Sequence, residues 1–360
     1  MKMPTDVIRE EIRLHGVISF ARFMELALYC PETGYYETRQ DNVGRGGDFI
    51  TSVSTGSLFG ELLAFQFAAW LTELRNADCG LRIVEAGAHD GKLARDILTW
   101  LQTHRPKLFS EITYDILEPS QRRQAWQRET LKAFVNVRWF ANFEDLKSHP
   151  SKAEIHGVMF GNELLDAFPV RRLGWHAQEK QWFEWGVAFA DGKFVWARRE
   201  NAECGICNTE LEAVLTDGYT IEASPAAENW WRAAAAVLTR GKLLAIDYGF
   251  TAEEQFSPAR LNGTLRAYHR HHVSDNLLAR PGEQDLTAHV NFSAIQQAGE
   301  AAGLKTETFC TQPQFLTRIL PSAMAEASWV QWNVKQTRQF QTLTHPEHLG
   351  RAFRVLVQSR

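Results

Sequence analysis

The sequence predicts an α/β fold built on a doubly wound, mostly parallel sheet. From residue 82 onward, short apolar segments alternate with helical patterns, which is typical of parallel strands joined by helices. The first of these segments ends in a glycine-bearing turn that leads directly into a helix, as in Rossmann-like folds. The chain has 360 residues, of which 44% are hydrophobic, enough to bury a large core.

The elements follow in order along the chain. Residues 5–29 are expected to form one amphipathic helix, and Ser57 to Leu74 a strongly apolar one. Core strands are expected at 82–87, 112–118, 136–140, 156–163, 242–249, 304–310 and 353–359. Helices are expected from Lys92, from Ser120, over 226–239 and from Ser293.

A stretch rich in Trp and Phe interrupts this alternation. Segments 170–176, 181–189 and 193–199 are separated by turn signals such as Asp191-Gly192, which predicts an antiparallel β insertion. The chain then divides into six segments. These are an N-terminal helical region with a glycine-rich loop (1–80), the first part of the core (81–169), the β insertion (170–225), more core (226–250), a loop-rich insertion on the substrate side (251–290) and the end of the core (291–360).

Composition narrows the function and the compartment. A formal net charge of −4 gives no overall basic field, so nucleic acid is not an expected partner. No apolar run is long enough for a membrane span. Five cysteines, an odd number spread thinly, favour a reducing compartment. Because the N-terminus has neither a signal core nor a transit-peptide composition, a cytoplasmic location is expected.

Two strand ends carry candidate cofactor-binding residues. The turn after the first strand contains Glu85, Gly87 and Gly91, and the glycines allow close approach of a ligand to the backbone. The second strand ends in Glu118, a carboxylate suited to ribose hydroxyls. An ordinary strand-to-helix turn with a solvated Glu is the alternative. The absent GxGxxG pattern argues against a nicotinamide-dependent oxidoreductase.

No metal site is expected. The histidines cluster at His269, His271 and His272, followed by His289, but adjacent residues of an extended chain point to opposite sides and do not converge on one ion. A single C-x-x-C pair, Cys204 and Cys207, has no second pair to complete a zinc site.

Four segments, in the same order, resemble the MidA family of S-adenosylmethionine-dependent methyltransferases, whose mitochondrial relatives methylate a protein arginine. They are LALYCPETGYY (26–36) with GGDFITS (46–52), VEAGAHDGKLARDIL (84–98), GNELLDAFPV (161–170) and the long stretch from GTLRAYH to HVNF (263–292). The resemblance covers about residues 5 to 310. It implies a Rossmann-like class I methyltransferase fold, S-adenosyl-L-methionine as cofactor, an arginine side chain of a protein partner as acceptor, and a homodimer.

The resemblance also suggests site residues. Paired carboxylates can hold a guanidinium bidentately, so Glu163, Asp166 and Asp285 are the candidate catalytic acids, although Asp166 and Asp285 could equally be cap or turn residues. Arg266 and Tyr268 are candidates for substrate binding. The candidate cofactor-binding set is Gly47, Asp48, Thr51, Glu85, Gly87, Gly91, Glu118 and Asn162.

Two departures from the family pattern leave a second hypothesis open. Val53 and Ser54 stand where the family has Pro-Glu, and His89 and Lys92 stand where it has Gly and Thr. A side chain at position 89 could obstruct the backbone approach that glycine permits, or could itself contact the ligand. The alternative function is therefore a paralogue that keeps the fold but binds S-adenosylmethionine weakly and acts as a binding or assembly protein.

Overall fold

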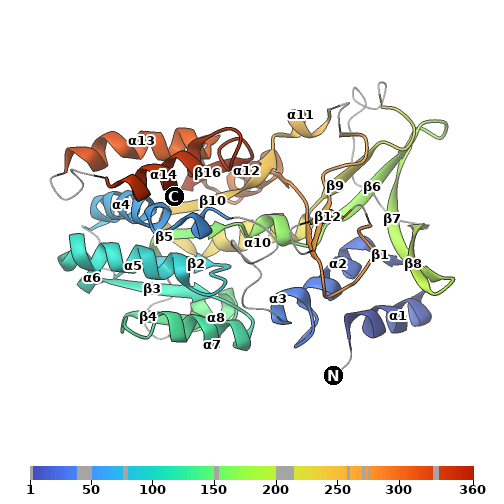
Figure 1. Cartoon of the computed structure of the whole chain (residues 1–360), viewed down its shortest axis with the longest axis horizontal. Coiled ribbons are helices and arrows are strands. Elements are labelled where there is room, and N and C mark those ends of the chain that lie inside the picture. Colours follow the sequence, from blue (N-terminus) through green and yellow to red (C-terminus); the bar gives the residue numbers. More distant parts are fainter. Residues whose placement is uncertain are drawn as a thin grey trace.

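A computed structural model shows the fold of the chain (Figure 1). It describes residues 3–38, 51–75, 80–149, 154–199, 215–257, 260–269, 272–274, 276–326 and 332–360. Outside these ranges lie the predicted residues Gly47, Asp48, Cys204, Cys207 and His271. None of the described helices combines the length and the apolar character needed to cross a bilayer.

The main sheet confirms the predicted doubly wound architecture. In the described part of the chain it has eight strands, with the order β15-β16-β10-β5-β2-β3-β4 and with β14 beside β10. Neighbours from β10 to β4 are parallel, whereas β16 is antiparallel to both β10 and β15. The strands are β2 (Leu81–Ala86), β3 (Ile112–Leu117), β4 (Val137–Phe140), β5 (Ile155–Asn162), β10 (Leu238–Phe250), β14 (Val290–Asn291), β15 (Lys305–Thr311) and β16 (Phe353–Ser359).

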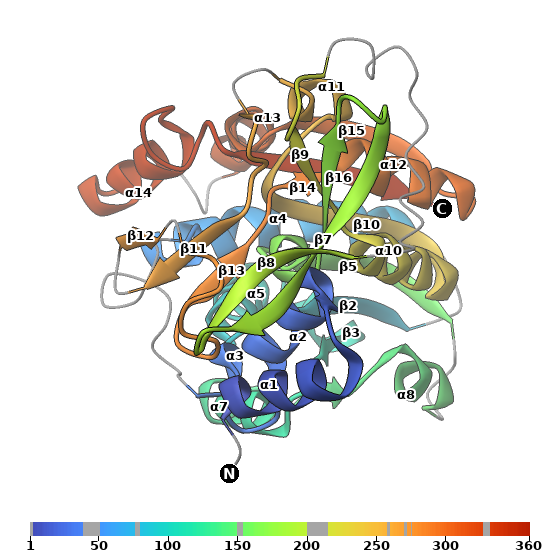
Figure 2. The same ribbon diagram turned by 90° about the vertical axis from the view of Figure 1, so that its right-hand side faces the viewer.

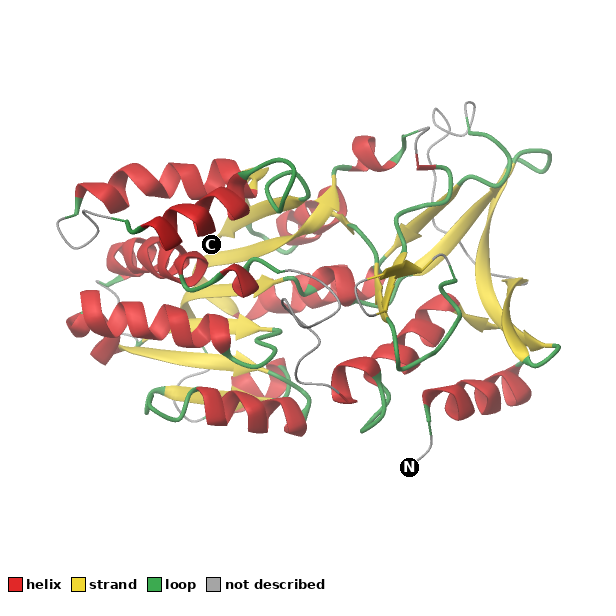
Figure 3. Cartoon of the chain, viewed as in Figure 1, coloured by secondary structure: helices red, strands yellow, loops and turns green. Residues whose placement is uncertain are grey.

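Helices cover both faces of this sheet (Figure 3), which is why β2 and β5 are buried along their whole length. One hydrophobic cluster contains side chains of α4 (Leu58–Leu74), α5 (Lys92–His104), α6 (Pro106–Glu111), α13 (Gln312–Ala325) and α14 (Val334–Thr344). A second cluster, on the other face, contains side chains of α8 (Phe143–Ser148), α10 (Pro225–Val237) and α12 (Phe292–Ala301). Helix α7 (Gln121–Thr130) follows β3.

The prediction of one helix over 5–29 is wrong. The structure has α1 (Pro4–His15), the short strand β1 (Ile18–Ser19) and α2 (Phe20–Tyr29), followed by α3 (Tyr35–Thr38). Gly16 ends the first helix with a φ of 75° and donates its N–H to the carbonyl of Ile12. Ser19 then caps α2 by accepting from the N–H of Arg22 at 3.1 Å. The helix-ending glycine and the capping serine are both visible in the sequence.

The β insertion forms a second, antiparallel sheet at the other end of the molecule from the main sheet (Figure 1), and this sheet faces the viewer in Figure 2. Its strands are β6 (Arg171–His176), β7 (Gln181–Ala190), β8 (Lys193–Arg199) and β9 (Thr220–Ala223), and β1 from the N-terminus pairs with β7. Helices α1 and α2 pack in one hydrophobic cluster with this sheet. The segment 1–80 is therefore divided, because its later part, α4, belongs to the main core.

The segment 251–290 has more structure than the loop-rich insertion that was predicted. Besides the short helix α11 (Ala252–Gln255), it contains a small antiparallel sheet with the order β12-β11-β13. These strands are β11 (Arg266–His269), β12 (His272–Ser274) and β13 (Asp285–Thr287). Each is too short to show a clear period of two in the sequence.

Helices α13 and α14 were not predicted, although each begins with a capping signal. Thr311 and Gln314 form a capping box at the start of α13, and Asn333 and Gln336 form one at the start of α14. This spacing, a short polar residue followed three positions later by Gln or Glu, is a sequence signature of a helix N-terminus.

Two glycines allow the central strands to approach one another. A Cβ atom at Gly157 in β5 would lie 1.9 Å from the carbonyl oxygen of Arg82, and one at Gly241 in β10 would lie 1.9 Å from that of Gly157. Both contacts are with backbone, which cannot move aside without displacing a strand.

We therefore expect Gly157→Ala to lower the free energy of unfolding by about 1–3 kcal/mol or more. Gly80→Ala is the control, because its new Cβ would meet no atom within 4 Å and should change stability by less than about 0.5 kcal/mol. Denaturant unfolding of the two variants measures the difference, and equal stabilities would contradict the packing argument.

Candidate active site

A pocket lies at the carboxyl ends of β2 and β5, where the strand order of the main sheet reverses. Open α/β sheets bind ligands at such a point. In Figure 1 these strand ends face the middle of the molecule, next to α3. The described residues that line the pocket are Tyr29, Tyr36, Thr51, Val53, Ser54, Glu85, Gly87, Ala88, His89, Asp90, Lys92, Leu93, Arg123, Asn162, Glu163, Leu164 and Ala167.

The turn from β2 to α5 has three residues in the left-handed region, with φ values of 74° at Gly87, 46° at His89 and 82° at Gly91. His89 thus adopts a conformation that suits glycine, which explains why glycine is the family residue there. Its carbonyl accepts from Nε2 of Gln127 at 3.0 Å, and its Nδ1 lies 3.8 Å from Oδ1 of Asp90. The imidazole therefore lies near Asp90, and His89 is one of the residues that line the pocket.

Glu85 ends β2 as a buried carboxyl group. Its Oε2 accepts from the hydroxyl of Tyr114 at 2.6 Å. Burial raises the pKa of Glu85 to about 8, because the charged form is desolvated, although the hydrogen bond from Tyr114 opposes the increase. A cation in the pocket would favour the ionised form of this group.

Glu118 lies just behind the pocket surface. It is 1% exposed, accepts from the N–H of Ser120 at 2.8 Å and pairs with Nη2 of Arg123 at 3.1 Å. Gln127 donates to its other oxygen at 3.3 Å. Arg123 itself lines the pocket, and its buried Nε has no hydrogen-bond partner among the described residues. The sequence did not indicate Arg123, because nothing in its local pattern distinguishes it from a solvated helix residue.

Glu163 follows β5 in a strained conformation, with φ of 50°. Its Oε1 accepts from the N–H of Ser52 at 3.2 Å and from Nδ2 of Asn162 at 3.1 Å. Its Oε2 is buried and has no hydrogen-bond partner among the described residues, as is Oδ1 of Asn162. Burial raises the pKa of Glu163 to about 8, and the charge of Asp247 adds to the increase. A strained residue with an unsatisfied carboxyl oxygen at a pocket suggests a functional role.

Asp247, in β10, holds the loop that carries Glu163. Its Oδ2 accepts from the backbone N–H groups of Leu164 at 3.0 Å and Leu165 at 2.7 Å, and more weakly from that of Asp166 at 3.4 Å. It is 1% exposed, and burial raises its pKa to about 7 despite these hydrogen bonds. The sequence analysis missed Asp247, although an acid near the end of a predicted core strand was a usable signal.

Comparisons with known proteins agree with this arrangement. Residues 62–310 match the protein family described as "Putative S-adenosyl-L-methionine-dependent methyltransferase". The chain belongs to this methyltransferase family.

A Burkholderia thailandensis protein crystallised with bound S-adenosyl-homocysteine superposes with a TM-score of 0.84 at 34% identity, over 99% of this chain and 92% of that one. The mouse mitochondrial protein arginine methyltransferase NDUFAF7 is 28% identical over 81% of this chain and 68% of its own length. The Drosophila melanogaster homologue is 28% identical over 97% of this chain and 83% of its own length.

The methyltransferase presents only one of the three predicted catalytic acids, Glu163, on the pocket surface. Asp166 is buried in the 3₁₀ turn η2 (Leu165–Ala167), and Asp285 is buried at the start of β13. Asp285 accepts from the hydroxyl of Tyr36 at 2.8 Å. Burial, together with the charges of Asp247 and Asp285, raises the pKa of Asp166 well above its usual value. Both acids lie behind the wall of the pocket. A direct catalytic role for either of them stays a prediction.

The N-terminal helices complete the wall in front of these acids. Tyr29 from α2 donates to the carbonyl of Ala167 at 2.9 Å, and its ring stacks on that of Tyr36 from α3 at 5.5 Å. Both tyrosines lie in the segment that resembles the family's N-terminal signature, yet the sequence did not indicate that they reach the strand ends. Their distance in sequence from β5 explains why they were missed.

The remaining predicted residues divide between the pocket and its surroundings. Thr51, Glu85, Gly87 and Asn162 line it, whereas Gly91 lies one step away at the start of α5. Arg266 is exposed on β11, and Tyr268 pairs with Asp285 across β11 and β13, but neither lines the pocket. In the part of the chain that the structure describes, no three His, Cys, Asp or Glu side chains are grouped as metal ligands.

The described residues fit S-adenosylmethionine, the methyl donor of this family. The left-handed glycine turn provides a close approach at the strand ends, and unsatisfied polar atoms on Asn162, Glu163 and Arg123 lie beside it. The carboxyl group of Glu85 lines the pocket near the end of β2, and that of Glu118 lies after β3, just behind the pocket surface.

The left-handed conformation of position 89 leads to a stability prediction. His89→Gly should be more stable to unfolding than His89→Ala by about 1 kcal/mol, because only glycine avoids the Cβ strain of a positive φ. Both variants lose the imidazole, so their comparison isolates the backbone effect. Denaturant midpoints of the two proteins test this, and a more stable alanine variant would refute it.

The unsatisfied carboxyl of Glu163 leads to a prediction about how the stability of the protein depends on pH. Between its ordinary value of 4.5 and its folded pKa of about 8, the group ionises in the unfolded chain but stays protonated in the folded one. Glu163 therefore makes the wild type lose stability as pH rises through this window, and Glu163→Gln lacks this contribution.

The melting temperature of Glu163→Gln should accordingly exceed that of the wild type by more at pH 8.5 than at pH 5, with a stability difference on the order of 1–2 kcal/mol. Calorimetry at the two pH values measures this. A constant difference across the range would show that Glu163 is ionised in the folded protein throughout.

Proposed function

We propose that this methyltransferase transfers a methyl group from S-adenosylmethionine to a guanidinium nitrogen of an arginine in a protein partner. The hydrogen bonding of the Glu163 carboxyl group is the observation that carries the proposal. One of its carboxyl oxygens is oriented by two N–H donors while the other lacks any donor among the described residues. A guanidinium presents N–H groups in a fixed fork that suits a carboxylate. The names of the mouse and fly relatives support arginine as the acceptor.

In this proposal the cofactor lies against the turn between β2 and α5. Glu85 would accept from the amino group of its methionine part, and Glu118 with Gln127 would face the ribose hydroxyls. Thr51, Gly87 and Asn162 would contact it from the pocket wall, and Gly91 would shape the turn. S-adenosylmethionine supplies an electrophilic methyl group on a positively charged sulfur.

The acceptor would bind between Glu163 and the tyrosine wall. Tyr29 and Tyr36 exclude water on one side, and a guanidinium can lie against such rings through cation–π attraction. Glu163 would hold two N–H groups and so keep the reacting nitrogen in line with the methyl group. The nitrogen–carbon bond forms as the carbon–sulfur bond breaks, and the electron pair stays on sulfur. One proton then leaves the acceptor, and the Glu163 carboxylate can receive it.

A second candidate function is a binding or assembly protein with weak cofactor affinity. Two pocket residues favour it, because Val53 and Ser54 line the pocket at the positions where the resemblance to the family implies Pro-Glu and therefore a carboxylate. Calorimetric titration with S-adenosylmethionine and S-adenosylhomocysteine separates the two functions. Micromolar binding supports the enzyme, whereas a folded protein that binds neither compound supports the alternative.

The pH dependence of turnover tests the role of Glu163. If the carboxylate must be ionised to hold the guanidinium, kcat/KM for the acceptor should rise with pH through about 8, the pKa of Glu163 in the free protein. Glu163→Gln should lower kcat by about 10²-fold or more and abolish this rise, while its affinity for S-adenosylhomocysteine stays close to that of the wild type. Transfer of labelled methyl groups to protein, followed by hydrolysis and identification of methylarginine, measures both.

The measurement has a clear negative outcome. Unchanged turnover in Glu163→Gln would exclude Glu163 from acceptor binding, and recovery of methyllysine in place of methylarginine would exclude the proposed acceptor.

A further inference from the structure

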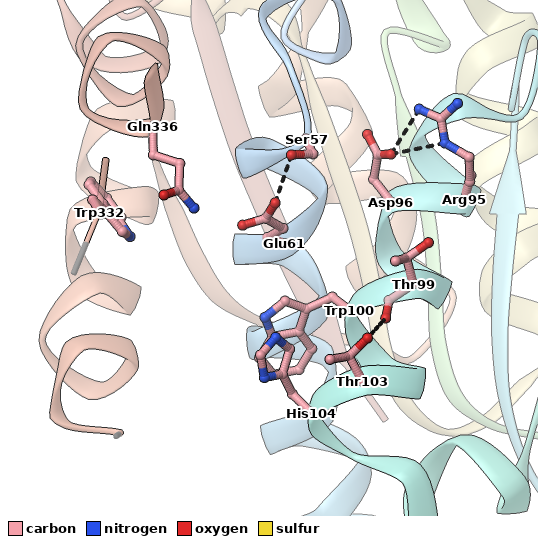
Figure 4. Close-up of a pocket in the computed structure, with 10 residues that line it drawn as sticks. All are labelled: Ser57, Glu61, Arg95, Asp96, Thr99, Trp100, Thr103, His104, Trp332 and Gln336. Atoms are coloured by element: carbon pink, nitrogen blue, oxygen red, sulfur yellow. Dashed lines mark hydrogen bonds and ion pairs between the residues drawn. The ribbon is translucent and has the colours of Figure 1, made fainter. Parts of the chain in front are cut away.

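A second pocket lies between α4, α5 and α14, on the helical layer that covers one face of the main sheet (Figure 4). Its volume is about 470 Å³, within the range of ligand-binding pockets. It shares no lining residue with the pocket at the strand ends. Whatever binds here is therefore separate from cofactor and acceptor, and the inference does not rest on the proposed function.

One wall of this pocket carries two carboxylates, those of Glu61 on α4 and Asp96 on α5. The Asp96 side chain is only 10% exposed. Its Oδ1 accepts from Nε of Arg95 at 3.2 Å and from Nη2 at 3.0 Å. Its Oδ2 accepts no hydrogen bond from the described residues, and Figure 4 shows this oxygen turned away from Arg95. Ser57 donates to Oε1 of Glu61 at 2.7 Å.

The two helices approach closely at this wall. A Cβ at Gly60 would lie 2.7 Å from Cβ of Asp96, so only glycine allows Asp96 to sit against α4. Burial raises the pKa of Asp96, Arg95 opposes the increase, and the nearby charge of Glu61 adds to it. Arg95, whose side chain is 46% exposed, pairs with Asp96, whereas Glu61 has no ion-pair partner among the described residues, so the negative charge at this wall is only partly balanced.

Aromatic rings line the pocket together with polar side chains such as Thr99, Thr103 and Gln336. Trp100 and His104 lie one turn apart on α5, with ring centroids 4.9 Å apart. Trp332 precedes α14, and Figure 4 shows it across α4 from the α5 residues. The ring of Trp100 is 3% exposed and already lies under the guanidinium of Arg105, 5.3 Å from the ring centroid, so Trp332 is the tryptophan that can receive a ligand.

We propose that this pocket is a docking site for a basic side chain, arginine or lysine, from a segment of a protein partner. The cationic group would pair with Oδ2 of Asp96 and with Glu61, and the aliphatic stem would pack on Trp332. Charge complementarity decides the class of ligand, because Oδ2 of Asp96 and the carboxylate of Glu61 give this wall a negative charge that a cationic group would neutralise. The volume exceeds that of a simple ammonium ion, which favours a side chain with neighbouring residues.

Calorimetric titration of the full-length protein tests the binding. The probes are blocked tripeptides with arginine, lysine or citrulline between two glycines. The experiment uses Glu163→Gln protein saturated with S-adenosylhomocysteine, so that binding at the proposed acceptor site is suppressed. The arginine or lysine peptide should bind, and the uncharged citrulline peptide should bind at least about tenfold more weakly, or about 1.4 kcal/mol. Equal binding of the citrulline and arginine peptides would overturn the proposal.

Matched variants test whether the charged peptide binds in this pocket. Asp96→Asn should weaken the charged peptide about tenfold, whereas Glu129→Gln, an equal charge change at an exposed side chain outside the pocket, should leave affinity unchanged. Thermal melting checks that each variant is folded. An arginine peptide with a photoreactive flank should label residues 92–104 or 332–344. Labelling confined to 160–170 would place the peptide at the strand ends and overturn the proposal.

Discussion

The hydrogen bonds from the loop after β5 to the carboxylate of Asp247 organise the candidate site. Backbone N–H groups of Leu164 and Leu165 converge on one oxygen of this residue, which sits on the neighbouring strand β10. They keep the chain in the tight turn that puts Glu163 at a φ of 50° and beside the pocket. Such a conformation is costly for a side chain other than glycine, so it needs a partner as strong as a buried carboxylate.

The site combines structures that are distant in sequence. The main sheet provides the strand ends, while α2 and α3 bring Tyr29 and Tyr36 against the loop that follows β5. Tyr36 also binds Asp285, from the small sheet of the segment 251–290. The pocket wall is thus assembled from three parts of the chain, and its shape depends on how the N-terminal helices pack on the β insertion.

Buried acids are the main electrostatic feature of this region. Burial raises the pKa of Glu85, Glu163 and Asp247 toward neutrality, and each is costly to ionise in a site without a bound cation. Groups with shifted pKa values are concentrated at functional sites of proteins. These carboxyls reduce the stability of the folded chain at high pH. A cation bound in the pocket, such as the positively charged sulfur of S-adenosylmethionine, would favour their ionised forms.

The sequence by itself determined the doubly wound sheet, the antiparallel insertion, the glycine turn and the presence of Asn162 and Glu163 at a strand end. These features depend on local patterns, namely the apolar periodicity, the turn residues and the order of strands and helices. Only the tertiary structure decided that Glu163 faces the pocket while Asp166 and Asp285 lie behind it, and that Tyr29, Tyr36, Arg123 and Asp247 belong to the site. The physical reason is that a side chain's burial and partners are set by contacts between distant segments, which no local pattern records.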